Sequence, residues 1–377
     1  MARTYLDYAS TTPLRPEAGT AMIALLEASG NGEIGDPSRS HSEGLDARRL
    51  VEDCRDVVAA ALGARSREVV FCSGATEAIA AASHGAVRAD PTRPHSVLSA
   101  VEHAAVRTCA ERGPHTSVGA DRYGRVSPDE LLDAVRSDTA VVHLQWANHE
   151  VGTIQPVAEV AARVAELDDV LFHVDAAQAA GRTAISFKRS GADLLSVSGH
   201  KLGGPTGVGA LLVRRGVRLD PLITGGDQER ARRAGIENVV AIAGFAAALN
   251  AATATLAAET ERLEALRSRI VDWARDAAGV GVLGHPDERL AQLVCLEIDG
   301  IEPQPILIGL DRVGIAVHSG NSCSSEALEP SPVLAAMGAD AQHSLRISMG
   351  HLTTDEDIDR LLAELPRVLE QLWALRR

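Results

Sequence analysis

The sequence predicts an α/β protein with a large domain built on a mainly parallel sheet and a smaller α+β domain in the C-terminal part. Three observations support this. Apolar runs of strand length alternate with alanine-rich helical patterns through the first two thirds of the chain, which is typical of βαβ units. After about residue 240 this alternation stops. A chain of 377 residues is also too long for one ordinary core.

The elements follow in order along the chain. The expected strands of the large domain are 69–74, 96–103, 140–147, 170–178, 193–201 and 207–215, with helices at 43–63, 77–88 and 156–167. The C-terminal part predicts two long helices over roughly 239–277, a strand at 294–299, a loop rich in Gly, Ser and Asn at 319–325, and a closing helix after 353–357. We expect a large domain over 13–250 and a small domain, made of 1–12 and 251–377, that carries this loop.

Composition limits the classes of function. The net charge of −14 gives no overall basic field for nucleic acid, and no run of about 18 apolar residues predicts a membrane span. The N-terminus has no apolar signal core, so we expect a cytoplasmic protein. Because the cysteines form no CxxC pair, we expect neither a metal site nor a disulfide framework. The cysteines are Cys54, Cys72, Cys109, Cys295 and Cys323.

Polar residues follow several predicted strands where each strand ends: Ser73, Glu102–His103, Asp175 and His200–Lys201. In a parallel sheet, ligands gather at the carboxyl ends of the strands. The repeated pattern therefore predicts one shared site.

Lys201 lies between an apolar strand and the glycine-rich stretch LGGPTGVG. A partly desolvated lysine has a lowered pKa and can form a Schiff base with an aldehyde. The chain has only one other lysine, Lys188, in the polar stretch FKRSG, and it fits an ordinary surface position better. The alternative for Lys201 is also a surface loop.

Asp175 ends the strand VLFHVD. A buried carboxylate needs a partner, and the pyridinium nitrogen of pyridoxal phosphate (PLP) is one such partner. Gln178 could donate to the phenolic oxygen of the same ring. The alternative is an aspartate that caps the following segment.

The stretch SGATEA, residues 73–78, opens a helix, where backbone N–H groups and the Thr76 hydroxyl suit a phosphate. An ordinary helix cap with a first-turn glutamate is the alternative. His103, at another strand end, could stack on a cofactor ring or carry protons, or could be structural.

Cys323 lies among small polar residues in HSGNSCSSEALEPS, as an accessible nucleophilic thiol requires, whereas the other cysteines lie in apolar or helical patterns. Arg346, on the probable strand SLRIS, could bind a carboxylate with two hydrogen bonds. Its alternative is a surface salt bridge.

Taken in order, these stretches resemble the NifS/IscS-like cysteine desulfurases, which are class V, fold type I PLP enzymes with an aspartate aminotransferase-like fold. The resemblance runs from YLDYASTTP (5–13) to SLRISMGHLTTDEDID (344–359) and includes SRSHSEG, FCSGATEA, VEHAAV, ANHEVGTIQP, HVDAAQAAG, SGHKLGGPTGVGAL, GGDQE and SGNSCSSEALEPSPVL. The loop around Cys323 is similar to that of the group with a long cysteine loop.

The resemblance implies that Lys201 holds PLP, that His103 stacks on its ring, and that Asp175 and Gln178 bind the ring's polar atoms. It implies a phosphate site made by Ala75, Thr76, Ser198 and His200. Arg346 would bind the carboxylate of L-cysteine, and Cys323 would take its sulfur as a persulfide, leaving alanine. A homodimer and a sulfur-acceptor or scaffold protein are implied partners, with iron–sulfur cluster assembly among the possible routes.

The chain departs from the family pattern at three places. His149 stands where the family has a second Asn that contacts the cofactor and substrate region. Ile236 stands where the family has a Thr that reaches the phosphate of the partner subunit, and the early segment reads Asp36-Pro37-Ser38-Arg39. These departures indicate a specialised member.

Two other classes of function stay open. The chain could be another PLP enzyme on the same fold, such as a C–S or C–Se lyase or an aminotransferase, but such an enzyme would not need Cys323. It could also be a non-catalytic scaffold, which His149 and Ile236 alone favour.

Overall fold

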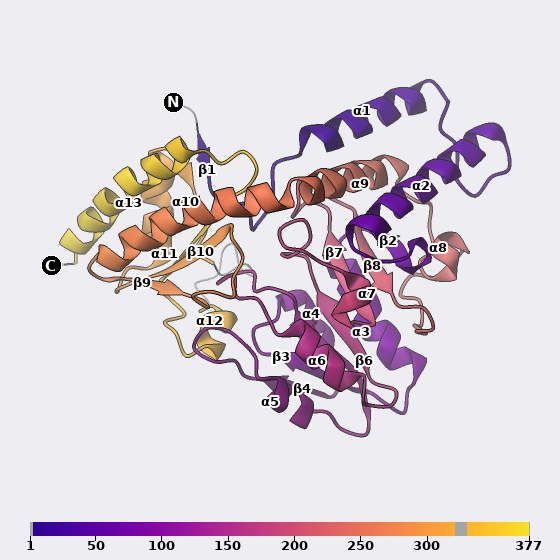
Figure 1. Cartoon of the computed structure of the whole chain (residues 1–377), viewed down its shortest axis with the longest axis horizontal. Helices are drawn as coiled ribbons and strands as arrows, with labels where there is room; N and C mark the ends of the chain where they lie inside the picture. The colour runs from indigo at the N-terminus through magenta and orange to yellow at the C-terminus, as the bar shows by residue number, and fades with distance from the viewer. Residues whose placement is uncertain (1–2, 321–329, 377) are drawn as a thin grey trace.

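A seven-stranded sheet lies at the centre of the larger part of the molecule (Figure 1). The computed structural model describes residues 3–320 and 330–376. The strand order is β2-β8-β7-β6-β5-β3-β4, and β8 runs antiparallel to both of its neighbours whereas the other pairs are parallel. The strands are β2 (Val69–Cys72), β3 (His95–Ser99), β4 (His115–Val118), β5 (Thr139–Gln145), β6 (Leu171–Asp175), β7 (Leu194–Ser198) and β8 (Gly209–Val213).

The six strands predicted for this sheet are confirmed, with shorter ends. The strands β2, β7 and β8 are followed directly by Ser73, Gly199 and Arg214, which leave the sheet, whereas Ala100 and Val101 separate the end of β3 from Glu102. The edge strand β4 was not predicted, because HTSV has no apolar run and two of its side chains are exposed.

Helices cover this sheet. They are α1 (Pro16–Gly30), α2 (Ser42–Ala61), α3 (Ala75–Ala89), α4 (Ala104–Ala110), α5 (Pro128–Asp133), α6 (Val157–Val164), α7 (Phe187–Ser190), α8 (Gln228–Ala231) and α9 (Val239–Ala254), with a short 3₁₀ turn at Ser66–Glu68. Both α1 and α2 pack along α9, and the ring of Phe245 in α9 meets Phe71 of β2 edge-on at 6.5 Å. One large apolar cluster joins α1, α2 and α9 to the sheet, whereas α3 and α4 pack in two smaller clusters.

A second apolar cluster lies around a three-stranded antiparallel sheet of order β12-β10-β9, made of β9 (Val280–Leu283), β10 (Leu293–Ile298) and β12 (Ser344–Ser348). The helices α10 (Leu256–Asp276), α11 (Pro303–Arg312) and α13 (Asp355–Ala374) accompany it. The start of the chain joins this part, because β1 (Thr4–Tyr5) pairs with β11 (Ile315–Ala316) and Leu6 is in the cluster. The short α12 (Pro332–Ala336) packs instead with the first cluster.

The helices α9 and α10 meet at Thr255 with a bend of 71°. This confirms the two long helices expected over 239–277. No single helix among the described residues is long and apolar enough to span a membrane, and α9 with α10 passes such a test only as a bent pair. Most of α9 is buried in the first cluster, which accounts for its apolar sequence.

Candidate active site

A cavity of about 390 Å³ opens at the carboxyl ends of the parallel strands, as the sequence predicts. It brings together ten of the predicted site residues, Ala75, Thr76, His103, His149, Asp175, Gln178, Ser198, His200, Lys201 and Arg346. The remaining one, Cys323, lies outside the described residues. Positions separated by up to 271 residues in the chain thus face one space.

Lys201 lines this cavity just after β7. Its Nζ donates hydrogen bonds to the carbonyls of Ala9 at 2.6 Å and Ser10 at 2.9 Å. Burial, with the nearby guanidinium groups of Arg346 and Arg182, lowers the pKa of Lys201 from 10.5 to about 7. A large fraction of the amine is therefore neutral near neutral pH, which is the form that attacks an aldehyde.

Asp175 ends β6 and is buried beside the same cavity. Its Oδ1 accepts a hydrogen bond from the backbone of Ala177 at 2.9 Å, so the capping alternative holds for one oxygen. Desolvation raises the pKa of this carboxyl, and a cationic ring nitrogen would stabilise its ionised form. Gln178 donates from Nε2 to the carbonyl of Ala9 at 2.8 Å, which fixes its side chain at the cavity wall.

The N-terminus of α3 forms another wall of the cavity, with Ala75 and Thr76 in its first turn. Gly74 caps this helix without a side-chain hydrogen bond. It packs closely on Gly209, because a Cβ added at Gly209 would lie 2.7 Å from the Cα of Gly74. Glu77 accepts from the backbone of Ser73 at 2.8 Å, as the capping alternative expects. The helix end still presents backbone N–H groups to the cavity, a suitable place for a phosphate.

Ser198 is the last residue of β7, and His200 follows it two positions later. Both side chains line the cavity. The Nδ1 atom of His200 lies 3.3 Å from the hydroxyl of Thr11. Burial, together with Lys201, lowers the pKa of His200 to about 4, so this imidazole is neutral at physiological pH.

His103 and His149 face each other across the cavity wall, with ring centroids 5.1 Å apart and planes at 74°. Burial, with the neighbouring His149 and Lys201, lowers the pKa of His103 to about 3. Its Nδ1 accepts a hydrogen bond from the backbone of Ala105 at 3.1 Å and so caps α4. His103 therefore has a structural role as well as a place at the site.

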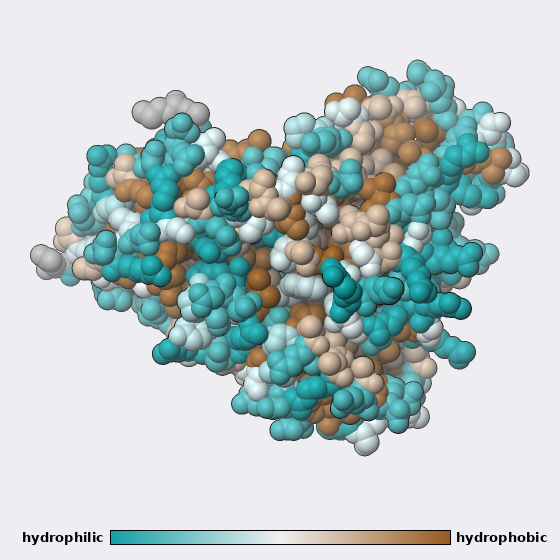
Figure 2. Space-filling view, in the orientation of Figure 1, coloured by the Kyte–Doolittle hydropathy of each residue, from teal (hydrophilic) through white to brown (hydrophobic). Residues whose placement is uncertain are grey.

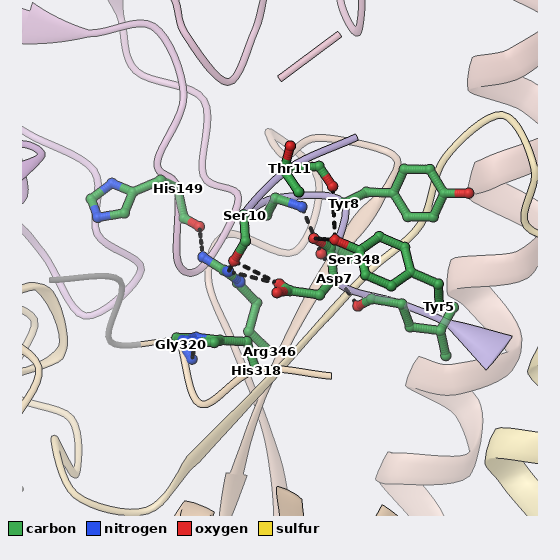
Figure 3. Close-up of polar contacts among 12 residues, drawn as sticks. Tyr5, Asp7, Tyr8, Ser10, Thr11, His149, His318, Gly320, Arg346 and Ser348 are labelled. Carbon is green, nitrogen blue, oxygen red and sulfur yellow. Dashed lines mark hydrogen bonds and ion pairs between the residues drawn. The ribbon is translucent and has the colours of Figure 1, made fainter. Parts of the chain in front are cut away.

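Arg346 is almost fully buried, so the alternative of a surface salt bridge is wrong. Figure 3 shows its guanidinium reaching from β12 toward the start of the chain, where Nη2 donates to Asp7 at 3.0 Å and to Ser10 at 2.9 Å. Nη1 donates to the backbone carbonyl of His149 at 2.9 Å. Arg346 thereby links the second sheet to the cavity.

One cavity residue, Gln145, was not identified from the sequence, whereas its partner Glu102 was already part of the strand-end pattern. Gln145 ends β5 and lines the cavity, and its backbone N–H donates to the buried carboxylate of Glu102 at 2.8 Å. Burial raises the pKa of Glu102 to about 8. Gln145 follows the same strand-end pattern as Asp175, so the same signal could have found it.

The cavity fits PLP on chemical grounds. It offers a lysine with a lowered pKa for the aldehyde, a buried carboxylate for the ring nitrogen, and a helix N-terminus for the phosphate. Each of these groups can bind one functional group of that cofactor.

Comparisons with known proteins agree with this geometry. The family model of aminotransferase class-V matches residues 4–361. The chain is a class-V aminotransferase family member of the cysteine desulfurase group. It is 39% identical to "Cysteine desulfurase IscS" of Methanosarcina thermophila, with 98% of this chain and 92% of the relative covered. It is 41% identical to "Cysteine desulfurase" of Cereibacter sphaeroides, with 100% and 98% covered.

Among solved structures, a NifS-like protein superposes with a TM-score of 0.90 at 31% identity, covering 98% of this chain and 100% of that one. The resemblance to NifS/IscS-like enzymes and the fold type I architecture are therefore confirmed.

Proposed function

We propose that this family member is a PLP-dependent cysteine desulfurase that converts L-cysteine to L-alanine and leaves the sulfur as a persulfide on Cys323. The observation that carries the proposal is the pairing of Lys201, with its pKa lowered to about 7, and the buried Asp175 in one cavity. Similarity over the whole chain to proteins named cysteine desulfurase supports the choice of reaction.

The residues of the cavity divide the work. PLP, when bound, supplies an electron sink for bond breaking next to the substrate's Cα. Lys201 would hold it covalently, Asp175 and Gln178 would bind the ring, and His103 would lie against its face. The phosphate would lie against Ala75, Thr76, Ser198 and His200, all of which line the cavity.

The sulfur transfer itself would belong to Cys323. Its thiolate attacks the substrate sulfur, an S–S bond forms, and the C–S bond breaks with its electron pair left on carbon. A proton then completes alanine, and the outer sulfur of the persulfide passes to an acceptor protein. Arg346 would hold the substrate carboxylate through donors that include Nε, which has no partner among the described residues.

We further propose a cytoplasmic homodimer with a large domain over 13–250 and a small domain of 1–12 and 251–377. The second apolar cluster, which includes Leu6, supports this division, although Ala9 and α12 pack with the first cluster. Iron–sulfur cluster assembly is one fate for the sulfur, supported by relatives named IscS.

The decisive experiment is Cys323→Ser. A serine hydroxyl is scarcely ionised at neutral pH, so the variant should keep its PLP absorbance and its spectral response to L-cysteine, yet release no alanine above background. Wild-type protein treated with L-cysteine should carry one extra sulfur on Cys323 by mass spectrometry, removable by a thiol reductant.

Cys109→Ser is the matched control, because the partly buried thiol of Cys109 has a pKa raised by desolvation. It should turn over within about twofold of wild type. Normal alanine release by Cys323→Ser, or a persulfide on another cysteine, would contradict the proposal and favour a different PLP lyase.

A further inference from the structure

His149 is a buried imidazole with two different surroundings. Its Nε2 lies 3.5 Å from Oε1 of Glu150, whereas its Nδ1 has no hydrogen-bond partner among the described residues. His149 also lines the cavity and meets His103 edge-on. A buried nitrogen without a partner costs free energy, so it is a place where a bound ligand gains by supplying one.

Glu150 is held rigidly in front of His149. Its Oε2 accepts a hydrogen bond from the hydroxyl of Ser331 at 2.5 Å, which leaves Oε1 to face the imidazole. The backbone N–H of Glu150 donates to the side chain of Asn148 at 2.8 Å, and Asn148 is itself tied to the carbonyl of Val101 at 3.1 Å. The carboxylate therefore has little freedom to turn away.

This arrangement determines which nitrogen of His149 carries the proton. A carboxylate oxygen attracts an N–H and repels a nitrogen lone pair, so the neutral ring is stabilised with its proton on Nε2. Nδ1 is then left as an acceptor. The charged and titratable groups around this ring come from several elements and are Glu150, His103, Asp175, Lys201 and Arg346.

His103 is fixed in the complementary role. Its Nδ1 lone pair is already used by the backbone N–H of Ala105 at 3.1 Å, so its proton lies on Nε2. His103 can therefore offer an N–H donor to the cavity, whereas His149 offers an acceptor. Two neighbouring imidazoles thus have opposite hydrogen-bonding roles, set by their other partners.

We propose that Glu150 is a positioning residue that fixes His149 with its proton on Nε2, so that Nδ1 accepts a hydrogen bond from the cofactor-bound substrate. The identity of that ligand rests on the proposed function; the proton position does not. The substrate brings a matching donor: its amine is used in joining the cofactor, but the thiol of L-cysteine keeps its S–H.

Nitrogen NMR of protein labelled with ¹⁵N-histidine tests the proton position, both without PLP and loaded with it. The signals of His149 are identified by their loss in His149→Asn. We expect Nε2 to be the protonated nitrogen and Nδ1 the unprotonated one in the neutral ring. A proton on Nδ1 would overturn the proposal, and this result needs no variant of Glu150 and no enzyme activity.

Two substitutions of Glu150 test its role. Glu150→Leu removes the acceptor and should give a mixture of the two neutral forms of His149, whereas Glu150→Gln keeps an acceptor oxygen and should retain the Nε2 proton. The signals of His103 should stay the same in both variants, because its partner is the backbone of Ala105. Unchanged His149 signals in Glu150→Leu would show that another group fixes the ring.

The acceptor role is tested by comparing His149→Asn, which keeps an acceptor oxygen, with His149→Phe, which does not. Loss of one hydrogen bond should raise KM for L-cysteine about fivefold in the phenylalanine variant relative to the asparagine variant. Equal KM values would refute this role. Failure of the wild type to desulfurate L-cysteine would instead refute the proposed function and leave the NMR result standing.

Discussion

At the scale of single residues, burial gives ordinary side chains special chemistry. The same desolvation that lowers the pKa of Lys201 to about 7 raises that of Asp175, because each group is disfavoured in its charged form. In the roles proposed for these residues, PLP would relieve both costs, since it takes a neutral amine and offers a cationic ring nitrogen. The placement of these two residues supports the proposal that the cavity holds this cofactor.

Residue types at strand ends made most of this site predictable. Lys201, Asp175 and His103 end apolar runs, and parallel strands bring such ends together. The contacts of Arg346 with Asp7 and Ser10 were not predictable, because they join positions 339 and 336 residues apart and depend on how the start of the chain folds back.

Lys201→Ala should abolish covalent attachment of PLP. The exposed Lys188 is the matched control, and Lys188→Ala should leave attachment unchanged, because Lys188 does not line the cavity. Borohydride reduction followed by peptide mass spectrometry measures the adduct. An adduct on Lys188 would contradict the assignment.

The rate of PLP attachment should follow the pKa of Lys201. The neutral amine is the nucleophile, so the rate constant for PLP-free protein should rise as pH increases through about 7 and then level off. An ordinary lysine would show the rise near its usual pKa of about 10.4. Stopped-flow absorbance after mixing with PLP measures this profile, and a rate still climbing steeply above pH 9 would contradict it.

At the scale of elements, long apolar segments were predictable and short polar ones were not. The strand at 294–299 and the helix after 353–357 appear as β10 and α13. The pair β1–β11 has only two residues in each strand, too few for any periodicity to show. The segment of α8 was also hidden, because its shape depends on a distant ion pair.

That ion pair joins α8 to α2. Arg55 bonds both carboxylate oxygens of Glu229 at 2.6 and 2.8 Å, and Glu229 also accepts from the backbone of Phe71 at 2.8 Å. Glu229, Arg230 and Ala231 have φ values of 50°, 60° and 60°, a left-handed conformation that non-glycine residues rarely adopt. The buried pair therefore holds a strained segment in place.

Glu229→Gln should lower the free energy of unfolding by about 3 kcal/mol, because it leaves the buried guanidinium of Arg55 without its main countercharge. Asp129→Asn is the control, since it breaks an exposed ion pair with Arg163 and should cost at most about 1 kcal/mol. Urea denaturation followed by circular dichroism measures both. Equal losses in the two variants would show that Glu229 has no special role.

At the scale of the whole molecule, the site depends on two apolar clusters meeting across one cavity. Lys201 and Asp175 come from the seven-stranded sheet, whereas Arg346 comes from the three-stranded sheet and bonds the backbone of His149. The N-terminal segment lies between them, since Ala9 and Ser10 contact Lys201 and Ser10 also contacts Arg346. The alternation of strand and helix patterns in the sequence predicted a large and a small domain. It did not predict that residues 7–10 would connect them.

The surface carries apolar side chains that a monomer would leave in water. Ile236 is 62% exposed beside the segment 225–235, and Ile23 and Leu26 are exposed on α1, where Figure 2 shows apolar surface. Family resemblance places the segment 225–235 across the interface of the proposed homodimer. The apolar Ile236, in place of the family's Thr, would then be buried against the partner rather than bonded to its phosphate.

Ile236→Asp should therefore weaken the dimer. Each interface buries two copies of this side chain, at about 1.5 kcal/mol or more each, so the dissociation constant should rise at least about a hundredfold. Light scattering across a range of concentrations measures it. Leu375→Asp is the control, because Leu375 is 83% exposed at the end of α13, at the far end of the molecule from α8 in Figure 1. A wild-type monomer at micromolar concentration with full turnover would contradict the dimer itself, and an unchanged dissociation constant in Ile236→Asp would place its interface elsewhere.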